Sequence, residues 1–261
     1  MNRIKQLFEQ KKENILSIYF TAGYPALDST VDIAEALEKA GADFLEIGIP
    51  YSDPLADGPV IQNSSLQSIE NGMTLRVLFE QLKELRKRVS IPVLLMGYVN
   101  PILQYGVEKF CASCKEVGVD GVIAPDLPMY EYEEMYRGCF EGNQLSNIFL
   151  ITPQTSDERI RKIDELSNGF IYLLSSSSTT GKDVSLSDVT ENYFSRIKNM
   201  QLSNPTMIGF GISDNKSFAK ATEYANGAIV GTAFVRLLEQ ENYLDKIPEF
   251  ISSLKGKQEF A

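Results

Sequence analysis

Histidine is absent from this sequence of 261 residues. It is the side chain that most often acts as a general base near neutral pH, and it is the commonest protein ligand of metal ions. Its absence excludes Ser-His-Asp and Cys-His nucleophilic schemes and any histidine-ligated zinc site. Acid–base chemistry must therefore come from carboxylates, tyrosines, lysines or thiols, and we expect no metal site.

Cysteine is scarce. Only Cys111, Cys114 and Cys139 occur, which is typical of a protein of the reduced cytosol. Cys111 and Cys114 form a CxxC, but the helical pattern EKFCASCKEVG places both on one helix face. Without a second pair or a histidine, this spacing favours core packing over a metal or redox site.

Long apolar runs are also missing, so we expect no membrane span. The opening MNRIKQLFEQKKE is polar and helical, unlike a signal peptide, and we expect a cytoplasmic protein. Basic residues number 25 against 35 acidic ones, a net charge of -10, which argues against nucleic acid or an anionic membrane as partner. An anionic small molecule stays open, because backbone amides bind anions without side-chain charge.

Short apolar segments alternate with helical patterns along the whole chain. The apolar segments are 15–23, 43–49, 91–98, 121–128, 147–153, 169–177, 205–213 and 227–233. The helical patterns are 1–13, 29–40, 74–88, 107–117, 131–141, 157–167, 189–200, 214–224 and 234–254. Continuous apolar strands indicate a parallel sheet buried on both faces, and strict alternation indicates βαβ units.

Eight such units predict one α/β domain over residues 1–261, a (β/α)8 TIM barrel with an extra N-terminal helix. An open doubly wound sheet is the alternative. It is disfavoured because no GxGxxG follows the first strand.

Glu46 is the anomaly in this pattern, because it lies within the apolar strand 43–49. A buried carboxylate costs several kcal/mol unless it is protonated, paired or required by function. The next loop carries Asp53 and Asp57 among three prolines, which stiffen it. Glu46 is therefore a candidate catalytic acid–base, and a structural acid with a partner elsewhere in the fold is the alternative.

In a barrel, active sites lie where strands end and helices begin. Apolar or aromatic residues at four strand ends could line a slot for a flat group: Tyr19, Met96, Tyr172 and Phe210. The last two strands end in GFGIS and GAIVGTA, whose glycines suit a phosphate site. The long polar loop 175–188, which follows the sixth apolar segment, is typical of a lid.

No lysine occurs in a strand or at a strand end, which argues against a Schiff-base aldolase, and metal-dependent enolate chemistry lacks ligands. The reaction class that remains is acid–base chemistry on a phosphorylated substrate that has a planar part. A phosphosugar isomerase or epimerase stays open, with Asp126 as the only candidate second acid–base residue. A non-catalytic barrel that activates a partner is a third possibility.

Six segments in order resemble the tryptophan synthase alpha chain family nearly end to end: LEIGIPYSDPLADGPVIQ, GYVNPI, PDLP, YLLSSSSTTG, GFGIS and GAIVGTA. The first is highly specific. The resemblance implies retro-aldol cleavage of indole-3-glycerol phosphate to indole and D-glyceraldehyde 3-phosphate, with no cofactor in this chain. It also implies an alpha2-beta2 heterotetramer with a pyridoxal-phosphate beta chain, which receives the indole through a tunnel.

The resemblance assigns roles to individual residues. Glu46 is the acid–base residue, and Asp57 accepts a hydrogen bond from the indole N–H. Tyr172 lies beside Glu46, and Thr180 reaches toward Asp57. The remaining assignments are Tyr19, Met96 and Phe210 to the indole pocket, Gly181, Gly211, Gly231 and Thr232 to the phosphate, and Asp53, Pro54, Asn100 and Pro128 to the beta-chain face. SSSSTTG departs from many relatives at Ser178 and Thr179, so we expect altered lid dynamics with the chemistry retained.

Overall fold

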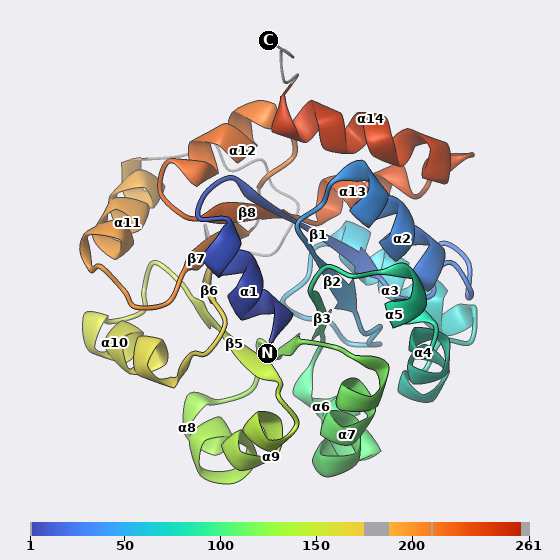
Figure 1. Ribbon diagram of the computed structural model, residues 1–261, viewed down its shortest axis with the longest axis horizontal. Coiled ribbons are helices and arrows are strands. Elements are labelled where there is room, and N and C mark those ends of the chain that lie inside the picture. The colour runs from blue at the N-terminus through green and yellow to red at the C-terminus, as the bar shows by residue number, and fades with distance from the viewer. Residues whose placement is uncertain (1, 175–187, 210, 257–261) are drawn as a thin grey trace.

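The strands of this chain close into a single parallel barrel (Figure 1). The computed structural model describes residues 2–174, 188–209 and 211–256. The strands are β1 (Ile15–Thr21), β2 (Phe44–Gly48), β3 (Val93–Met96), β4 (Gly121–Ile123), β5 (Ser146–Ile151), β6 (Ile171–Leu174), β7 (Thr206–Gly209) and β8 (Gly227–Val230). Each pairs with the next, and β8 pairs with β1. The predicted TIM barrel is confirmed.

Helices surround this barrel. They are α1 (Arg3–Gln10), α2 (Thr30–Ala40), α3 (Pro59–Glu70), α4 (Leu75–Leu82), α5 (Leu85–Arg88), α6 (Val99–Tyr105), α7 (Val107–Val117), α8 (Met129–Glu131), the π-helical turn η1 (Tyr132–Tyr136), α9 (Arg137–Gly142), α10 (Asp157–Leu166), α11 (Asp188–Asn199), α12 (Asn215–Thr222), α13 (Thr232–Leu237) and α14 (Tyr243–Lys255). No helix of the described segments is long and apolar enough to cross a membrane.

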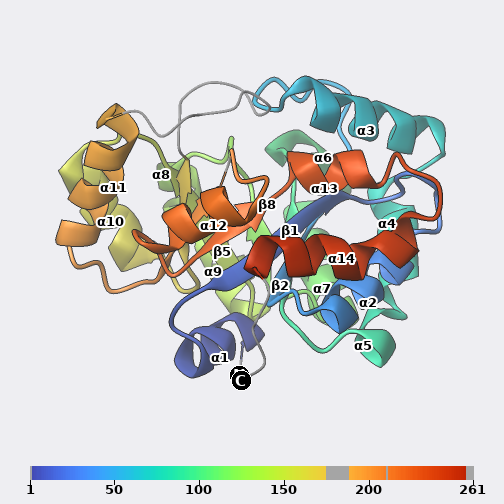
Figure 2. The same ribbon diagram turned by 90° about the horizontal axis from the view of Figure 1, so that it is seen from above.

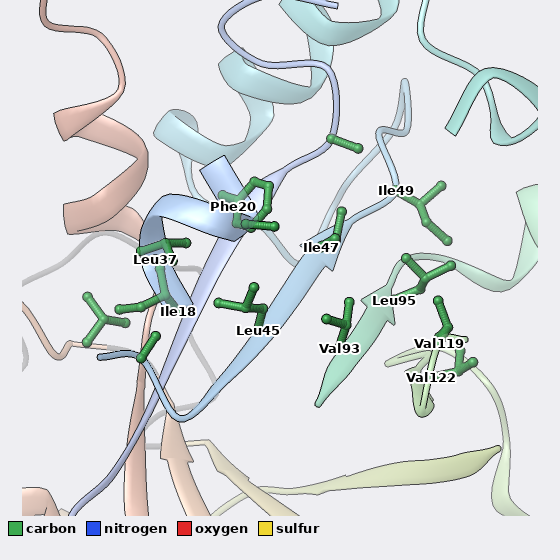
Figure 3. Close-up of a cluster of buried hydrophobic side chains, with 14 of the residues drawn as sticks. Ile18, Phe20, Leu37, Leu45, Ile47, Ile49, Val93, Leu95, Val119 and Val122 are labelled. Carbon is green, nitrogen blue, oxygen red and sulfur yellow. The ribbon is translucent and has the colours of Figure 1, made fainter. Parts of the chain in front are cut away.

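The strands are apolar on both faces because helices cover the outside and side chains fill the inside. Outward residues such as Leu45 and Ile47 join the main core with Leu37 of α2 (Figure 3). Cys111 and Cys114 lie buried in the same core, which confirms that their CxxC serves packing.

Helix α1 closes the N-terminal end of the barrel (Figure 2). Its Ile4 and Phe8 are buried against the inward residues Phe44 and Phe170. The Phe170 ring centroid lies 5.4 Å from that of Phe44 and 6.0 Å from that of Phe8. The N-terminal end of the barrel interior is thus packed with apolar groups, and a reactive site has room at the opposite end.

Two helices were not predicted from the sequence, α3 and α6. Helix α3 buries serines in place of an apolar stripe. Ser64 exchanges a hydrogen bond of 2.7 Å with Thr21, and Ser68 donates one of 2.5 Å to the carbonyl of Ala22. A helix held by hydroxyl groups leaves little hydrophobic periodicity for a sequence pattern to detect.

Some predicted boundaries were wrong. The segments 74–88 and 234–254 each form two helices, α4 with α5 and α13 with α14. Several strands end earlier than predicted; β3, for example, ends at Met96. The apolar residues beyond a strand end face the open end of the barrel, and the pattern could not separate them from the strand.

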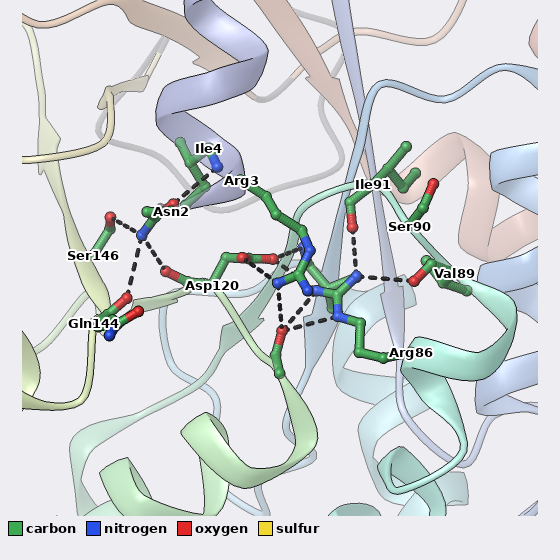
Figure 4. Close-up of polar contacts among 12 residues, drawn as sticks. Asn2, Arg3, Ile4, Arg86, Val89, Ser90, Ile91, Asp120, Gln144 and Ser146 are labelled. Atoms are coloured by element: carbon green, nitrogen blue, oxygen red, sulfur yellow. Dashed lines mark hydrogen bonds and ion pairs between the residues drawn. The ribbon is translucent and has the colours of Figure 1, made fainter.

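Asp120, the residue just before β4, connects several elements at the N-terminal end of the barrel (Figure 4). Its side chain is 4% exposed and lies 3.0 Å from Arg3 and 2.7 Å from Arg86. The amide of Val93 donates to the same carboxylate at 2.9 Å. Asn2 donates to the Asp120 carbonyl at 3.0 Å, so this residue joins α1 and α5 to two strands.

We predict that Asp120→Ala lowers the free energy of unfolding by about 3–5 kcal/mol, because it leaves the half-buried Arg86 without its counter-charge. Urea unfolding measures this loss. The control is Glu84→Ala, which breaks the exposed pair with Lys87 and costs about 0–1 kcal/mol. Equal losses in the two variants would contradict the role given to Asp120.

Candidate active site

Glu46 lies inside the barrel with no exposed surface. Its Oε1 accepts a hydrogen bond of 3.1 Å from the Ser17 hydroxyl, and its Oε2 is buried without a partner among the described residues. None of the ion pairs found in the described part of the chain includes it. The alternative was a structural acid with a partner elsewhere in the fold; among the described residues the Ser17 hydroxyl is the partner found, and no arginine pairs with Glu46.

Burial raises the pKa of Glu46 to about 8, and the Ser17 hydrogen bond opposes part of that rise. Desolvation disfavours the charged form of a carboxyl group, and no cation compensates here. At neutral pH the Glu46 side chain therefore carries a proton, and modest changes in its surroundings move it between its two forms.

Two tyrosines lie near this carboxyl group. Tyr19 of β1 pairs with Glu46 in the strand register, and Tyr172 of β6 is 3% exposed. Burial is the main cause that raises the pKa of both phenols, and the charges of Glu46 and Asp57 add to it. Both phenols are thus neutral at physiological pH.

Two glycines make room for these tyrosines. A Cβ atom at Gly48 would lie 2.2 Å from the Tyr19 hydroxyl oxygen, and one at Gly209 would lie 2.0 Å from that of Tyr172. Sequence reasoning did not assign these roles, because an inward glycine in a strand signals close approach without naming the group that approaches.

Asp57 lies in the loop between β2 and α3, and Tyr98 holds it in place. The Tyr98 hydroxyl donates to Oδ2 of Asp57 at 3.2 Å and accepts from the Ala56 amide at 3.0 Å. The ring of Tyr51 packs against Tyr98 at 5.0 Å between centroids. Sequence reasoning gave Tyr98 no role, because its hydroxyl partner comes from another loop.

The Asp57 loop is braced from within as well. The Asp57 amide donates to the Pro54 carbonyl at 3.0 Å, and the Gln62 side chain donates to the Asp57 carbonyl at 2.9 Å. Burial raises the pKa of Asp57 to about 6, while the Tyr98 hydrogen bond lowers it. Asp57 is therefore largely ionised at pH 7 while Glu46 is not, so the two carboxyl groups have separate tasks available to them.

Met96 contributes to the apolar wall of this end of the barrel. It is half-buried, pairs with Gly48 in the register and packs on the inner cluster with Leu150 and Leu174. The structure thus brings Glu46 and Met96 onto neighbouring strands at the same end of the barrel.

The predicted phosphate residues divide into two groups. Gly231 lies against Tyr19, whose ring is 3.5 Å from the position of a Cβ at Gly231, and Thr232 begins α13. Gly211 has a φ of 76°, a backbone conformation that favours glycine, and precedes α12. Asp214 already caps α12 through the Ser217 amide at 2.8 Å, whereas α13 begins without a side-chain cap. The start of α13 is therefore the better placed of the two for an anion.

Three predicted site residues lie outside the described residues: Thr180, Gly181 and Phe210. The departure at Ser178 and Thr179 lies there too. In the described part of the chain, no group of three Cys, Asp or Glu side chains could hold a metal ion.

The residues assigned to the partner face differ in exposure. Asp53, Asn100 and Pro128 are exposed, whereas Pro54 is buried within the chain. Asp126, the candidate second acid–base residue of an isomerase, accepts a hydrogen bond of 2.9 Å from the Val99 amide at the start of α6. This contact gives Asp126 a capping role.

Comparisons with known proteins identify the family. Residues 5–258 match the family model of the tryptophan synthase alpha chain. The tryptophan synthase alpha chain of Flavobacterium psychrophilum is 57% identical over 254 residues, which cover 97% of this chain and 100% of that protein. That of Flavobacterium johnsoniae is 55% identical over 255 residues, with coverage of 98% and 100%.

Solved structures agree. The chain superimposes on tryptophan synthase subunit alpha from Legionella pneumophila with a TM-score of 0.88 and 36% identity, over 98% of this chain and 97% of that one. It matches a chain of the aminoacrylate-bound tryptophan synthase from M. tuberculosis with a TM-score of 0.85 and 28% identity, over 98% of each. The resemblance read from the sequence motifs is confirmed. The chain belongs to the tryptophan synthase alpha chain family, whose members are carbon–carbon lyases of tryptophan biosynthesis.

Proposed function

We propose that this chain cleaves indole-3-glycerol phosphate to indole and D-glyceraldehyde 3-phosphate, and that Glu46 carries the protons. The observation that supports this proposal most is the burial of Glu46 without a cation, which raises its pKa to about 8. A carboxyl group that is neutral at pH 7 and has one oxygen without a partner among the described residues can both donate and recover a proton.

In the first step, protonated Glu46 gives its proton to C3 of the indole ring. The ring becomes a cation with its charge centred on nitrogen, and Glu46 becomes a carboxylate. Ionised Asp57 accepts the hydrogen bond of the ring N–H and stabilises that charge. Tyr98 holds Asp57 for this task through the hydrogen bond of 3.2 Å.

In the second step, the Glu46 carboxylate removes the proton from the hydroxyl group on the carbon attached to C3. The electron pair of the O–H bond forms the aldehyde, the C–C bond breaks, and its electrons return to the ring. Indole and the aldehyde are released and Glu46 is again protonated. The cycle therefore balances with no cofactor in this chain.

The other predicted residues hold the substrate. Tyr19, Met96, Tyr172 and Phe210 line the indole pocket, and the backbone amides of Gly181, Gly211, Gly231 and Thr232 hold the phosphate. Thr180 reaches toward Asp57. The uncapped start of α13 beside Tyr19 supports the part of this assignment that falls on Gly231 and Thr232.

The working unit proposed for this chain is an alpha2-beta2 heterotetramer in the cytoplasm, with pyridoxal phosphate in the beta chain. Asp53, Pro54, Asn100 and Pro128 form part of the face toward that partner. The exposure of Asp53, Asn100 and Pro128, and the nearby Leu55 at 85% exposed, support this placement. Pro54 is buried, and its carbonyl holds the loop in place by accepting a hydrogen bond from the Asp57 amide.

We predict that Glu46→Gln lowers indole release from indole-3-glycerol phosphate by at least about a hundredfold, because general acid–base catalysis typically contributes that much or more. The assay follows indole formation by the purified chain, with and without a beta chain. Glutamine keeps the shape of the side chain but cannot exchange the proton.

The control is Glu84→Gln, the same substitution at an exposed position on the outer surface. It should retain full activity. A Glu46→Gln variant that keeps more than about a tenth of the activity would remove Glu46 from the proposed chemistry and favour another proton carrier.

The pKa values predict a bell-shaped dependence of kcat/KM on pH. Activity rises through about pH 6 as Asp57 ionises, and falls through about pH 8 as Glu46 loses its proton. Steady-state assays across this range test both limbs. Activity that still increases above pH 8 would mean that Glu46 enters the reaction as the carboxylate.

A further inference from the structure

We propose that Ser17 is a positioning residue for Glu46: its hydroxyl fixes Oε1 as the hydrogen-bond acceptor and leaves Oε2 as the oxygen that exchanges the proton. This inference rests on the proposed function and deepens it. Sequence reasoning gave Ser17 no role, because it reads as one polar residue inside an apolar strand.

The geometry places Ser17 within reach of one oxygen only. Its hydroxyl lies 3.1 Å from Oε1 of Glu46, and both residues have no exposed surface. They stand on neighbouring strands: Ser17 pairs with Phe44, and Tyr19 pairs with Glu46. Both side chains therefore point into the barrel at adjacent levels.

The surroundings make this hydroxyl unusual. It lies inside the barrel two residues after Ile15 on β1, and Ile15 belongs to the inner apolar cluster with Leu94 and Ile148. A hydroxyl group in such a place costs free energy unless it forms a hydrogen bond, and among the side chains of the described residues Glu46 is its one hydrogen-bond partner. Packing alone does not require a hydroxyl group at this position.

Donation by Ser17 divides the two oxygens of Glu46 chemically. In the protonated acid, Oε1 accepts the hydrogen bond as the carbonyl oxygen, and the proton lies on Oε2. After the proton leaves, the same hydrogen bond becomes charge-assisted and stabilises the carboxylate. Burial favours the acid and Ser17 favours the anion, so the hydroxyl keeps both forms accessible during one catalytic cycle.

The other titratable groups that face Glu46 come from three elements. Tyr19 on β1 and Tyr172 on β6 have raised pKa values and are neutral across the working range. Asp57, from the loop after β2, titrates near 6. A change confined to the alkaline limb of the pH profile therefore reports on Glu46 and Ser17.

The test compares wild type with Ser17→Ala and Ser17→Cys in the complex with a beta chain. Cysteine nearly matches serine in size but is a weak donor, which guards against a packing effect of alanine. The alkaline limb of kcat/KM should move up by about one pH unit in both variants, while the acid limb stays in place. The control is Ser146→Ala, a buried serine at the N-terminal end of β5, which should shift neither limb.

A second measurement does not depend on activity. Infrared difference spectra against Glu46→Gln follow the carbonyl band of the protonated acid as the pH changes. In Ser17→Ala the band should move to higher frequency and its midpoint should rise by about one pH unit. An unchanged band and midpoint would overturn the role of Ser17. Wild type that releases no indole would contradict the proposed function, while the infrared titration still decides the inference.

Discussion

One constraint governs the site in this structure: a carboxyl group is buried without a counter-charge. Glu46 has no exposed surface and no ionic partner in the described part of the chain, so its proton stays bound at neutral pH. The surroundings serve that state. Ser17 supplies a single hydrogen bond, and Tyr19 and Tyr172 supply neutral phenols in place of charged groups. A cation beside Glu46 would stabilise its carboxylate as an ion pair and lower its pKa, so that Glu46 would have no proton to donate at neutral pH.

Contacts elsewhere in the barrel offset the free-energy cost of such a site. Helix α1 and the aromatic layer around Phe44 fill the lower interior, and Asp120 ties that end to two arginines. These apolar contacts and ion pairs lie at the N-terminal end, and the opposite end holds the carboxyl groups that are costly to bury. The Asp57 loop follows the same division, because Tyr98 and its internal hydrogen bonds hold one ionised carboxylate at the rim.

Much of the fold was predictable from the sequence, because alternating strands and helices produce a strong periodic pattern of apolar residues. The strands, most of the helices and the anomalous Glu46 all follow from apolar patterning. Helix α3 was missed since buried serines carry it, and Ser17 and Tyr98 were not assigned because their partners come from other elements. Local patterns report which face of an element is buried. They do not report which two side chains meet across the barrel.

The central claim is that Glu46 holds a proton at neutral pH, and carbon-13 NMR tests it directly. Carboxyl-labelled glutamate would be titrated in the wild-type chain, and the signal missing from Glu46→Gln would assign the resonance. The account predicts a midpoint near pH 8. A midpoint near the ordinary value of about 4.3 would contradict it, because Glu46 would then be a carboxylate at neutral pH with no proton to give.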